Sequence, residues 1–374
     1  MRVLALNAGS RSVKAQLLEV TPDSRPEAAA EPLWAGERLY RDGTADTVAA
    51  VRELLADLGP LTFDLAAHRI VQTASVPRAP AARFDAALAA DIEAASTLAP
   101  LHCKAVLAAQ AAFDAERPAT PQFGVFDSAF HRTLPARAAC FSGPYEWFED
   151  GLRKIGFHGL SYTYCVARAE IEFGPQKSAR LVCAHLGGGC SLAAIAGGVS
   201  IDTTMGYTPL DGVAMVSRSG ALDPGLLLHL LRSGRYTLDE LGRTLNEDSG
   251  VRGIAGGGGD LRDVRAAAAR GQTRAILALE IFTYRIRCAI GALAAALGGL
   301  DALVFTGGIG EHDAATRAEI CAGLAHLGVV LDPGRNATGR DGARIEAAAA
   351  SASVLVLRTR EEWIMALAAR DCAN

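Results

Sequence analysis

Apolar residues in the first twenty positions form two short runs separated by a turn of small and polar residues. Arg2–Leu6 and Ser12–Glu19 have the composition of two β-strands. The same arrangement returns in residues 181–198, where an apolar strand ends at His185, three glycines follow, and Cys190–Ala196 forms a second apolar run. We interpret these as duplicated nucleotide-binding halves, because a Rossmann unit would run strand, glycine loop, helix.

A third glycine turn, in residues 305–312, follows a predicted strand at Ala302–Phe305 and precedes a predicted helix at Ala314–Leu324. Apolar residues spaced by three and four predict further helices over residues 48–58 and 276–297. Mixed helices and strands with glycine turns at strand ends indicate an α/β architecture.

Two stretches, residues 21–47 and 333–352, are rich in Pro, Gly or Ala. We expect both to be surface connections, and neither carries a chemical signal.

The bulk composition narrows the class of protein. A chain of 374 residues favours two domains or one large one, and a net charge of −4 gives no basic surplus for nucleic acid or an anionic membrane. The eight cysteines form no CxxC pair, and the longest apolar run, Cys288–Leu300, is too short for a membrane span. We therefore expect a soluble cytoplasmic protein with reduced thiols.

Each glycine turn has the parts of a phosphate site. Asn7–Ser10 with Ser12 and Lys14 combines small residues, hydroxyls and a cation, although an ordinary hairpin turn would also explain it. His185–Gly189 offers main-chain N–H groups after a strand, with a flexible bulge as the alternative. Gly307–Glu311 enters a helix, which would bring a helix N-terminus close to a nucleotide.

Several charged side chains have an ambiguous setting in the sequence. Arg69 and Arg218 suit planar carboxylate or phosphate oxygens, but for any single arginine a structural salt bridge is the favoured alternative. His102 and His158 are flanked as expected of loop positions facing a pocket, with a structural role as the alternative. Asp127 follows a strand and is a candidate metal or substrate ligand, or a helix N-cap.

Two further segments with acidic residues also have two interpretations each. Asp260–Arg262 could bind ribose and stack on a purine, or form a local ion pair. Glu361 and Glu362 begin the last predicted helix, where the helix dipole alone would favour them.

Taken in order, these segments resemble those of the acetate kinase family, over almost the whole chain. The matching stretches are LNAGSRSVK (6–14), HRIV (68–71), LAPLH (98–102), VFDSAFH (125–131), GFHGLS (156–161), HLGGG (185–189), DTTMGYTPLDG (202–212), SRSGALDPG (217–225), DLRD (260–263), FTGGIGEH (305–312) and TREEW (359–363). DTTMGYTPLDG is the most distinctive of them.

The resemblance implies a duplicated ribonuclease H-like α/β fold of the actin/Hsp70-type ATPases, with two domains and a cleft between them. The N-terminal domain would be residues 1–148 plus 363–374, and the C-terminal nucleotide-binding domain residues 149–362. It also implies a homodimer that binds Mg2+ and ATP and converts acetate to acetyl phosphate and ADP.

Residue roles follow from the same resemblance. Asn7 and Glu361 match metal positions. The catalytic positions are Asp127, His158, Arg218 and Arg69, and Arg69 also matches the residue that binds the substrate carboxylate. An apolar slot for the acyl group would be formed by Val71, Leu101, Phe157 and Pro209. The nucleotide positions are Lys14, His185, Leu186, Gly187, Gly188, Gly189, Asp260, Leu261, Arg262, Gly308, Ile309, Gly310, Glu311 and His312.

The chemistry of the reaction agrees with these residue types. A carboxylic acid with a pKa of about 4 is already ionised at neutral pH, so no strong base is needed. The main task is to neutralise charge on the transferred phosphoryl group. We therefore expect Asp127 to orient magnesium or its waters. An apolar pocket that fits a methyl group discriminates against a substrate with one more methylene by only about 1–3 kcal/mol. Propionate is therefore a credible second substrate.

Some positions depart from the family pattern. They are Gln72, Thr73 and Ala74 after HRIV, Cys103 and Lys104 after LAPLH, Gly188 in place of asparagine, Ala221 in place of aspartate, and His312 in place of asparagine. These departures leave two alternatives open: a kinase for propionate, butyrate or another acid, and a binding relative without turnover.

Overall fold

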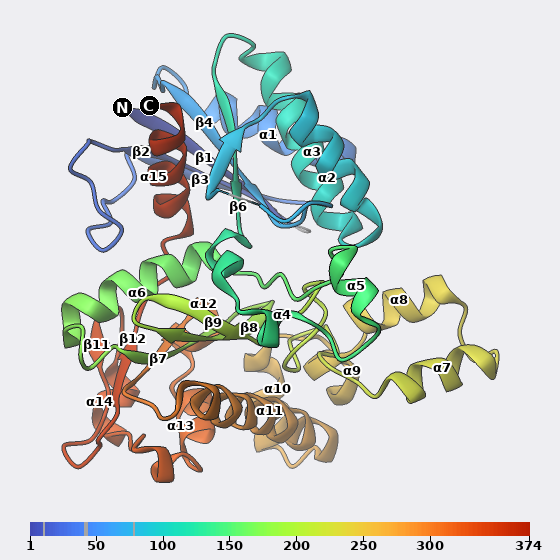
Figure 1. The fold of residues 1–374 in the computed structure, drawn as a ribbon, viewed down its shortest axis with the longest axis vertical. Helices are drawn as coiled ribbons and strands as arrows, with labels where there is room; N and C mark the ends of the chain where they lie inside the picture. The colour runs from blue at the N-terminus through green and yellow to red at the C-terminus, as the bar shows by residue number, and fades with distance from the viewer. Residues whose placement is uncertain (10–11, 41–43, 78) are drawn as a thin grey trace. The chain divides into compact units, whose positions relative to one another are not determined.

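Two six-stranded mixed sheets organise the computed structural model, one in each of two units of the chain (Figure 1). Unit 1 comprises Met1–Arg132, Phe157–Arg168 and Arg360–Asn374, and unit 2 comprises Thr133–Gly156 and Ala169–Thr359. The structure describes residues 1–9, 12–40, 44–77 and 79–374. Ser10 and the side chain of Leu101 lie outside the described part. The contact units begin and end at other residues than the domains expected from the sequence, whose boundaries stay a prediction.

The regular elements of unit 1 are β1 (Arg2–Ala8), β2 (Ser12–Glu19), β3 (Trp34–Leu39), α1 (Thr44–Asp57), β4 (Leu65–Ile70), β5 (Ala81–Arg83), α2 (Ala86–Ala94), η1 (Ala95–Thr97), α3 (Pro100–Glu116), β6 (Gln122–Phe126), η2 (Ala129–Thr133, whose last residue belongs to unit 2) and α15 (Glu361–Ala373). Helix α6 (Gly159–Phe173) has residues in both units. The sheet has the order β3-β2-β1-β4-β6-β5. Strands β1, β4 and β6 are parallel, and β2, β3 and β5 are antiparallel to their neighbours.

The elements of unit 2 are α4 (Ala136–Ala139), α5 (Tyr145–Glu149), β7 (Arg180–Leu186), β8 (Cys190–Ala196), β9 (Val199–Thr203), α7 (Pro224–Arg232), α8 (Leu238–Glu247), α9 (Gly250–Ala255), α10 (Leu261–Ala269), α11 (Thr273–Leu297), β10 (Ala302–Thr306), α12 (Gly307–His312), α13 (Ala314–Cys321), η3 (Ala325–Leu327), α14 (Pro333–Thr338), β11 (Ala343–Arg344) and β12 (Ser353–Val356). The sheet has the order β9-β8-β7-β10-β12-β11. Strands β7, β10 and β12 are parallel, and the other three are antiparallel to their neighbours.

The second sheet therefore repeats the first strand by strand. Each sheet begins with three consecutive antiparallel strands, β1–β3 in the first and β7–β9 in the second. On the other side of β1 or β7, two parallel strands and then a short antiparallel edge strand complete the sheet. This repetition confirms the duplicated halves that the strand–turn–strand patterns predict. The predicted helices at 48–58 and 276–297 are confirmed as α1 and α11.

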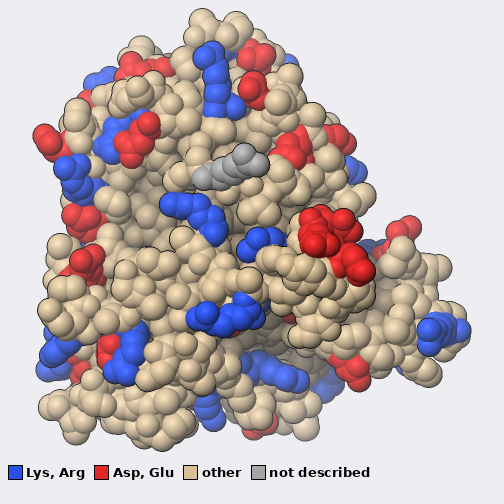
Figure 2. All heavy atoms as spheres, in the orientation of Figure 1, with Lys and Arg blue, Asp and Glu red and all other residues tan. Residues whose placement is uncertain are grey.

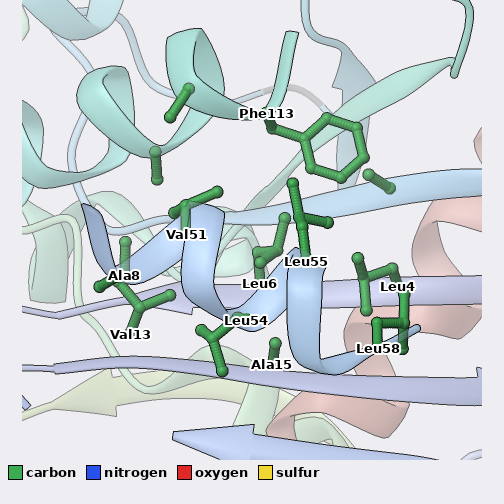
Figure 3. Packing of buried hydrophobic residues seen from close by; sticks show 14 of the residues in the cluster. Leu4, Leu6, Ala8, Val13, Ala15, Val51, Leu54, Leu55, Leu58 and Phe113 are labelled. Atoms are coloured by element: carbon green, nitrogen blue, oxygen red, sulfur yellow. The ribbon is translucent and has the colours of Figure 1, made fainter. Parts of the chain in front are cut away.

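The core of unit 1 lies between its sheet and helices α1 and α3 (Figure 3). Val51, Leu54 and Leu55 lie on one face of α1 because of their spacing. Together with Leu58, the residue after the helix, they belong to one buried cluster with Leu4, Leu6 and Phe113. On the other face, α15 packs against β1, β4 and β6, so the C-terminal segment belongs to the same unit as the N-terminus.

Three local expectations are wrong. Residues 21–47 contain β3, residues 333–352 contain α14 and β11, and the glycine turn of residues 305–312 is mostly the short helix α12. Strand β3 lies at the sheet edge and has no fully buried residue, so it lacks the hydrophobic pattern by which strands are predicted.

The surface agrees with the overall charge. On the face of the described residues drawn in Figure 2, Lys and Arg are interspersed with Asp and Glu, and the densest group of charge is acidic. Among the described helices, none combines the length and apolarity needed to cross a membrane. All eight cysteines are free thiols.

A buried histidine on β4 makes the stability of unit 1 dependent on pH. His68 is fully buried between Phe84 and Phe113, and its Nε2–H donates to Oε1 of Gln122 at 2.8 Å. Burial lowers the pKa of His68 to about 4, and the hydrogen bond to Gln122 opposes this only in part. The neutral ring is therefore required by the fold.

We predict that His68→Gln flattens the acid limb of the stability profile. The unfolded chain binds the proton near its ordinary pKa of about 6.5 and the native chain does not, so native stability falls as pH drops from 6.5 towards 4. Urea titrations at pH 7 and pH 4 should show the wild type losing about 3 kcal/mol more than the variant. The control His326→Gln, at an exposed position, should match the wild type. Equal losses in wild type and His68→Gln would contradict the prediction.

Candidate functional site

The parallel strands of unit 1 bring three polar residues to one edge of the sheet. The register pairs Leu6 with His68 and Ile70 with Phe126, so Asn7, Arg69 and Asp127 follow each other across β1, β4 and β6. The carboxyl ends of neighbouring parallel strands share an edge, which places these residues together although they are far apart in the sequence. Helix α15 adds Glu361 from the end of the chain.

Arg69 is the centre of this group. Its Nη2 is 2.9 Å from Oδ2 of Asp127, its Nη1 is 3.2 Å from Oε2 of Glu361, and Nη1 also donates to Oδ1 of Asn7 at 3.4 Å. The guanidinium is largely buried, with 15% of the side chain exposed. Burial alone would lower its pKa, but the two carboxylates outweigh burial and raise it. Arg69 is therefore a permanent buried cation.

The carboxylates around Arg69 keep oxygen atoms that no described residue satisfies. Oδ1 of Asp127 and Oε1 of Glu361 are buried without a hydrogen-bond partner, and Glu362 is nearby because its Oε1 accepts from Nδ2 of Asn7 at 3.3 Å. Burial raises the pKa of Glu361 to about 7; the guanidinium of Arg69 opposes the rise, and the charge of Asp127 adds to it. Unpaired buried oxygens of this kind favour a bound cation.

The donor set fits a hard divalent cation. Carboxylate and amide oxygens are the ligands that such ions take in proteins. Within the described part of the chain, no group of three or more His, Cys, Asp or Glu residues forms a complete metal cage. A site with few protein ligands suits an ion that keeps waters and phosphate oxygens in its shell.

His158 lies against the same aspartate in an unusual backbone conformation. It is the one non-glycine residue with a positive φ among the described residues, at 58°. Its backbone N–H donates to Oδ2 of Asp127 at 2.9 Å, and the N–H of Gly159 donates to the carbonyl of Asp127 at 2.7 Å. A Cβ at Gly159 would lie 2.3 Å from that carbonyl oxygen, so only glycine allows this approach. The carboxylate of Asp127 accepts from the guanidinium of Arg69 and from the backbone N–H of His158, so these contacts explain its position without a helix N-cap.

The other expected residues of unit 1 lie in different settings. Lys14 is half exposed, with its Nζ 3.7 Å from Glu37, and it also interacts electrostatically with Glu361. Val71 directly follows β4 and is half-buried, while Phe157 is buried and its carbonyl accepts from Nε2 of His131 at 3.0 Å. His102 lies inside helix α3, so its expected loop position is wrong.

In unit 2 the first glycine segment connects β7 to β8. The N–H of Gly187 donates to the carbonyl of Gly189 at 3.1 Å, and Sγ of Cys190 donates to the carbonyl of Gly187 at 3.3 Å. A Cβ at Gly188 would have no neighbour within 4 Å, so the backbone is open there. His185 and Leu186, at the end of β7, are buried.

The second glycine segment of unit 2 lies beside the first. Strands β7 and β10 are parallel neighbours with His185 opposite Thr306, so both segments leave the same edge of the sheet. Gly307 has φ of 79°, and a Cβ there would be 2.5 Å from the carbonyl oxygen of Leu186. Helix α12 can begin against the end of β7 only because residue 307 is glycine.

Arg218 is a half-buried cation without an acidic partner in the described part of the chain. Its Nη1 donates to the carbonyl of Pro209 at 3.3 Å, and no carboxylate of the described residues lies within ion-pair distance. Burial lowers the pKa of its guanidinium, and the nearby thiol of Cys190 opposes this. The salt-bridge alternative thus fails for Arg218, whereas Arg69 does form ion pairs.

The remaining nucleotide candidates of unit 2 have local partners. Asp260 caps α10 through the N–H of Arg262 and forms an ion pair with its guanidinium at 2.6 Å, while 90% of the Arg262 side chain is exposed. His312 lies 3.6 Å from Glu311. The local ion pair considered for residues 260 and 262 is therefore present, and their nucleotide role stays a prediction.

Two residues of these clusters are missed by the sequence argument. His131 bonds the carbonyl before His158, and Arg317 bonds the carbonyls of α12. Glu362, considered only together with the helix dipole, bonds Asn7. The motif VFDSAFH includes His131, but nothing in the sequence relates it to Phe157. Arg317 is a lone arginine in a predicted helix and gives no signal.

Duplicated sheets with glycine segments at their strand edges define the class of two-domain α/β ATPase folds of the actin and Hsp70 kind. Comparison with known proteins narrows this class. The model of the acetokinase family matches residues 2–367, and the chain belongs to that family.

Individual relatives agree with the family. Acetate kinase of Gloeobacter violaceus is 41% identical over 100% of this chain and 98% of the relative. The crystal structure of Porphyromonas gingivalis acetate kinase covers 100% of both chains at 32% identity with a TM-score of 0.83. A propionate kinase from Francisella tularensis, also 32% identical, has a TM-score of 0.86 over 98% of both chains.

We predict that His158→Gly is more stable than His158→Ala, by about 1 kcal/mol, because alanine retains the Cβ that the left-handed region disfavours. The control is Glu280, exposed in the middle of α11, where glycine should be less stable than alanine by about 1 kcal/mol. Urea unfolding of the four variants measures both differences. The same order at both positions would contradict the backbone assignment.

Proposed function

We propose that the protein transfers the γ-phosphoryl group of ATP to acetate, giving acetyl phosphate and ADP reversibly, with Mg2+ as the divalent ion. The observation that carries the proposal is the buried group of Arg69, Asp127 and Glu361, a cation beside unpaired carboxylate oxygens. Membership of the acetokinase family and relatives named acetate kinase support the substrate.

Arg69 is suited to hold the carboxylate substrate. Its Nε is buried without a partner, so the guanidinium retains a donor after binding Asp127 and Glu361. A planar fork of donors fits a carboxylate, which is already ionised at neutral pH. The substrate oxygen can then attack phosphorus without a protein base.

Magnesium, when bound, would neutralise charge on the phosphates. Asn7, Asp127 and Glu361 would hold it or its waters, and Oδ1 of Asp127 and Oε1 of Glu361 are the free acceptors. Oδ2 of Asp127 already accepts from Arg69 and from the N–H of His158. Asp127 therefore orients groups and does not take a proton from the substrate.

The groups of unit 2 suit the phosphates. The backbone at Gly188 can approach a phosphate oxygen closely because a Cβ there would have no neighbour within 4 Å, while the N–H of Gly187 is already bonded to the carbonyl of Gly189, and Gly188 supplies no side-chain donor. Arg218 brings a positive charge that no described carboxylate neutralises, which suits the transition-state charge. His158 would share that role through its ring, and Gly308–His312 with Asp260–Arg262 would hold the rest of the nucleotide.

Val71, which is half-buried, and Phe157, which is buried, are the apolar residues of unit 1 that would contact the acetate methyl. Propionate is the second candidate, because a structural neighbour is named propionate kinase. A cytoplasmic location is supported by the eight free cysteines. A homodimer is supported by the exposed Leu226 and Leu228 of α7.

We predict that acetate has the highest kcat/KM among acetate, propionate and butyrate, with propionate lower by ~10 to 200-fold because of one extra methylene. Trapping the acyl phosphate with hydroxylamine in the presence of ATP and Mg2+ measures all three. Butyrate turning over better than acetate would reassign the substrate. If none of the acids gives a hydroxamate, the alternative of a binding relative without turnover is supported.

We predict that Arg69→Met and Arg218→Met each lower kcat by about 100-fold or more, because each removes a charge aimed at an anion. Arg38→Met is the control, since Arg38 forms surface ion pairs with Glu53 and Asp57. Circular dichroism and steady-state kinetics on the folded variants test the roles. Near-normal turnover in either variant refutes the role of that arginine.

A further inference from the structure

Among the described residues, Arg317 of helix α13 is one of the largest fully buried side chains, with 0% exposure. Arginine is almost never completely buried unless its charge and its donors are satisfied. The setting of this residue therefore calls for an explanation other than surface solubility.

Every hydrogen bond of Arg317 goes to a carbonyl or amide oxygen. Nη1 donates to the carbonyls of Gly310 and Glu311, each at 2.8 Å. Nε donates to Oδ1 of Asn336 at 2.9 Å, and Nη2 donates to its carbonyl at 2.8 Å. Nδ2 of Asn336 in turn donates to the carbonyl of Ala314, so α12, α13 and α14 are joined by one buried network.

The two α12 carbonyls belong to the segment proposed to hold the nucleotide. Helix α12 has six residues, so its last carbonyls have no intrahelical partner and depend on another donor. Arg317 supplies that donor from the helix that follows. Since Gly307 fixes the start of α12 against β7, Arg317 fixes the other end.

The charge of Arg317 is not matched by a nearby free carboxylate. Asp313 is the carboxylate that interacts electrostatically with Arg317. It already accepts hydrogen bonds from the guanidinium of Arg265 and from the hydroxyl and the backbone N–H of Thr316. A buried cation whose contacts are all neutral oxygens favours an anion near the segment that it supports.

We propose that Arg317 is a positioning residue for nucleotide binding: it holds the backbone of Gly308–His312 in the shape that receives the nucleotide and adds positive potential beneath it. This inference rests on the proposed function, because it takes ATP as the ligand of α12. Arg317 itself does not touch the nucleotide, since it is fully buried.

Arg287 provides a matched control. It also donates to backbone carbonyls, those of Ile320 and Glu319, but these lie at the far end of α13. Removing Arg287 thus weakens the same helix without releasing α12.

The test compares Arg317→Lys, Arg317→Met and Arg287→Met in the full-length protein. ADP binding by isothermal titration, the KM of ATP, the KM of acetate and the melting temperature are measured for each. We expect Arg317→Met to weaken ADP binding by about tenfold or more, equivalent to about 1.4 kcal/mol. Arg317→Lys should lie between this variant and the wild type because it keeps the charge. The KM of acetate should change less than twofold.

The Arg287→Met control distinguishes the loss of α12 positioning from a general destabilisation of α13. Arg287→Met should lower the melting temperature while leaving ADP binding within twofold of the wild type. Equal weakening of ADP binding in Arg287→Met and Arg317→Met, or wild-type ADP binding in Arg317→Lys and Arg317→Met, overturns the inference. Where Arg317→Met does not fold, Arg317→Lys decides alone: unchanged ADP binding rejects the role.

These results are separable from failure of the proposed function. A wild-type protein that neither binds ADP nor phosphorylates any acid refutes the function itself. A wild type that does both, with Arg317 variants that resemble Arg287→Met, refutes only the role of Arg317.

Discussion

The ion pairs of Arg69 with Asp127 and Glu361 are the interaction on which the site in unit 1 depends. A buried guanidinium is costly unless its charge or its donors are satisfied, and Arg69 is satisfied by two carboxylates that themselves need a cation when buried. Three strands and the C-terminal helix must therefore meet at one point for any of these residues to be buried. The same pairing leaves one donor on Arg69 and one acceptor on each carboxylate, which are the groups that the proposed chemistry uses.

Unit 2 presents other chemical groups than unit 1. Its glycine segments present backbone N–H groups, and its cations, Arg218 and Arg317, have neutral partners in the described residues. Unit 1 thus offers oxygen ligands around a neutralised cation, whereas unit 2 offers positive potential. This division suits a metal ion and a carboxylate in one unit and polyphosphate in the other. The absence of a side chain at Gly188 makes the second role depend more on the backbone and on Arg218.

Much of the fold follows from the sequence because its signals are local. The strand–turn–strand patterns, the spacing of apolar residues in α1 and α11, and the glycines at strand ends each predict an element that the structure contains. Strand β3 and helix α12 are not predicted, since an edge strand lacks a buried face and a glycine-rich helix resembles a turn. The site residues could be named from motif positions, but the contacts of Glu362, His131 and Arg317 depend on the tertiary structure.

A double-mutant cycle between Arg69 and Asp127 tests the central claim most directly. The free energies of unfolding of Arg69→Met, Asp127→Asn, the double variant and the wild type are measured in urea. Arg69→Met leaves the buried carboxylates of Asp127 and Glu361 without their cation and should lose about 3 kcal/mol or more. Asp127→Asn removes one of the two carboxylates of Arg69 and should also lose stability, while the double variant should lose clearly less than the sum, with a coupling of at least about 1.5 kcal/mol. Losses that add to within about 0.5 kcal/mol would contradict the account.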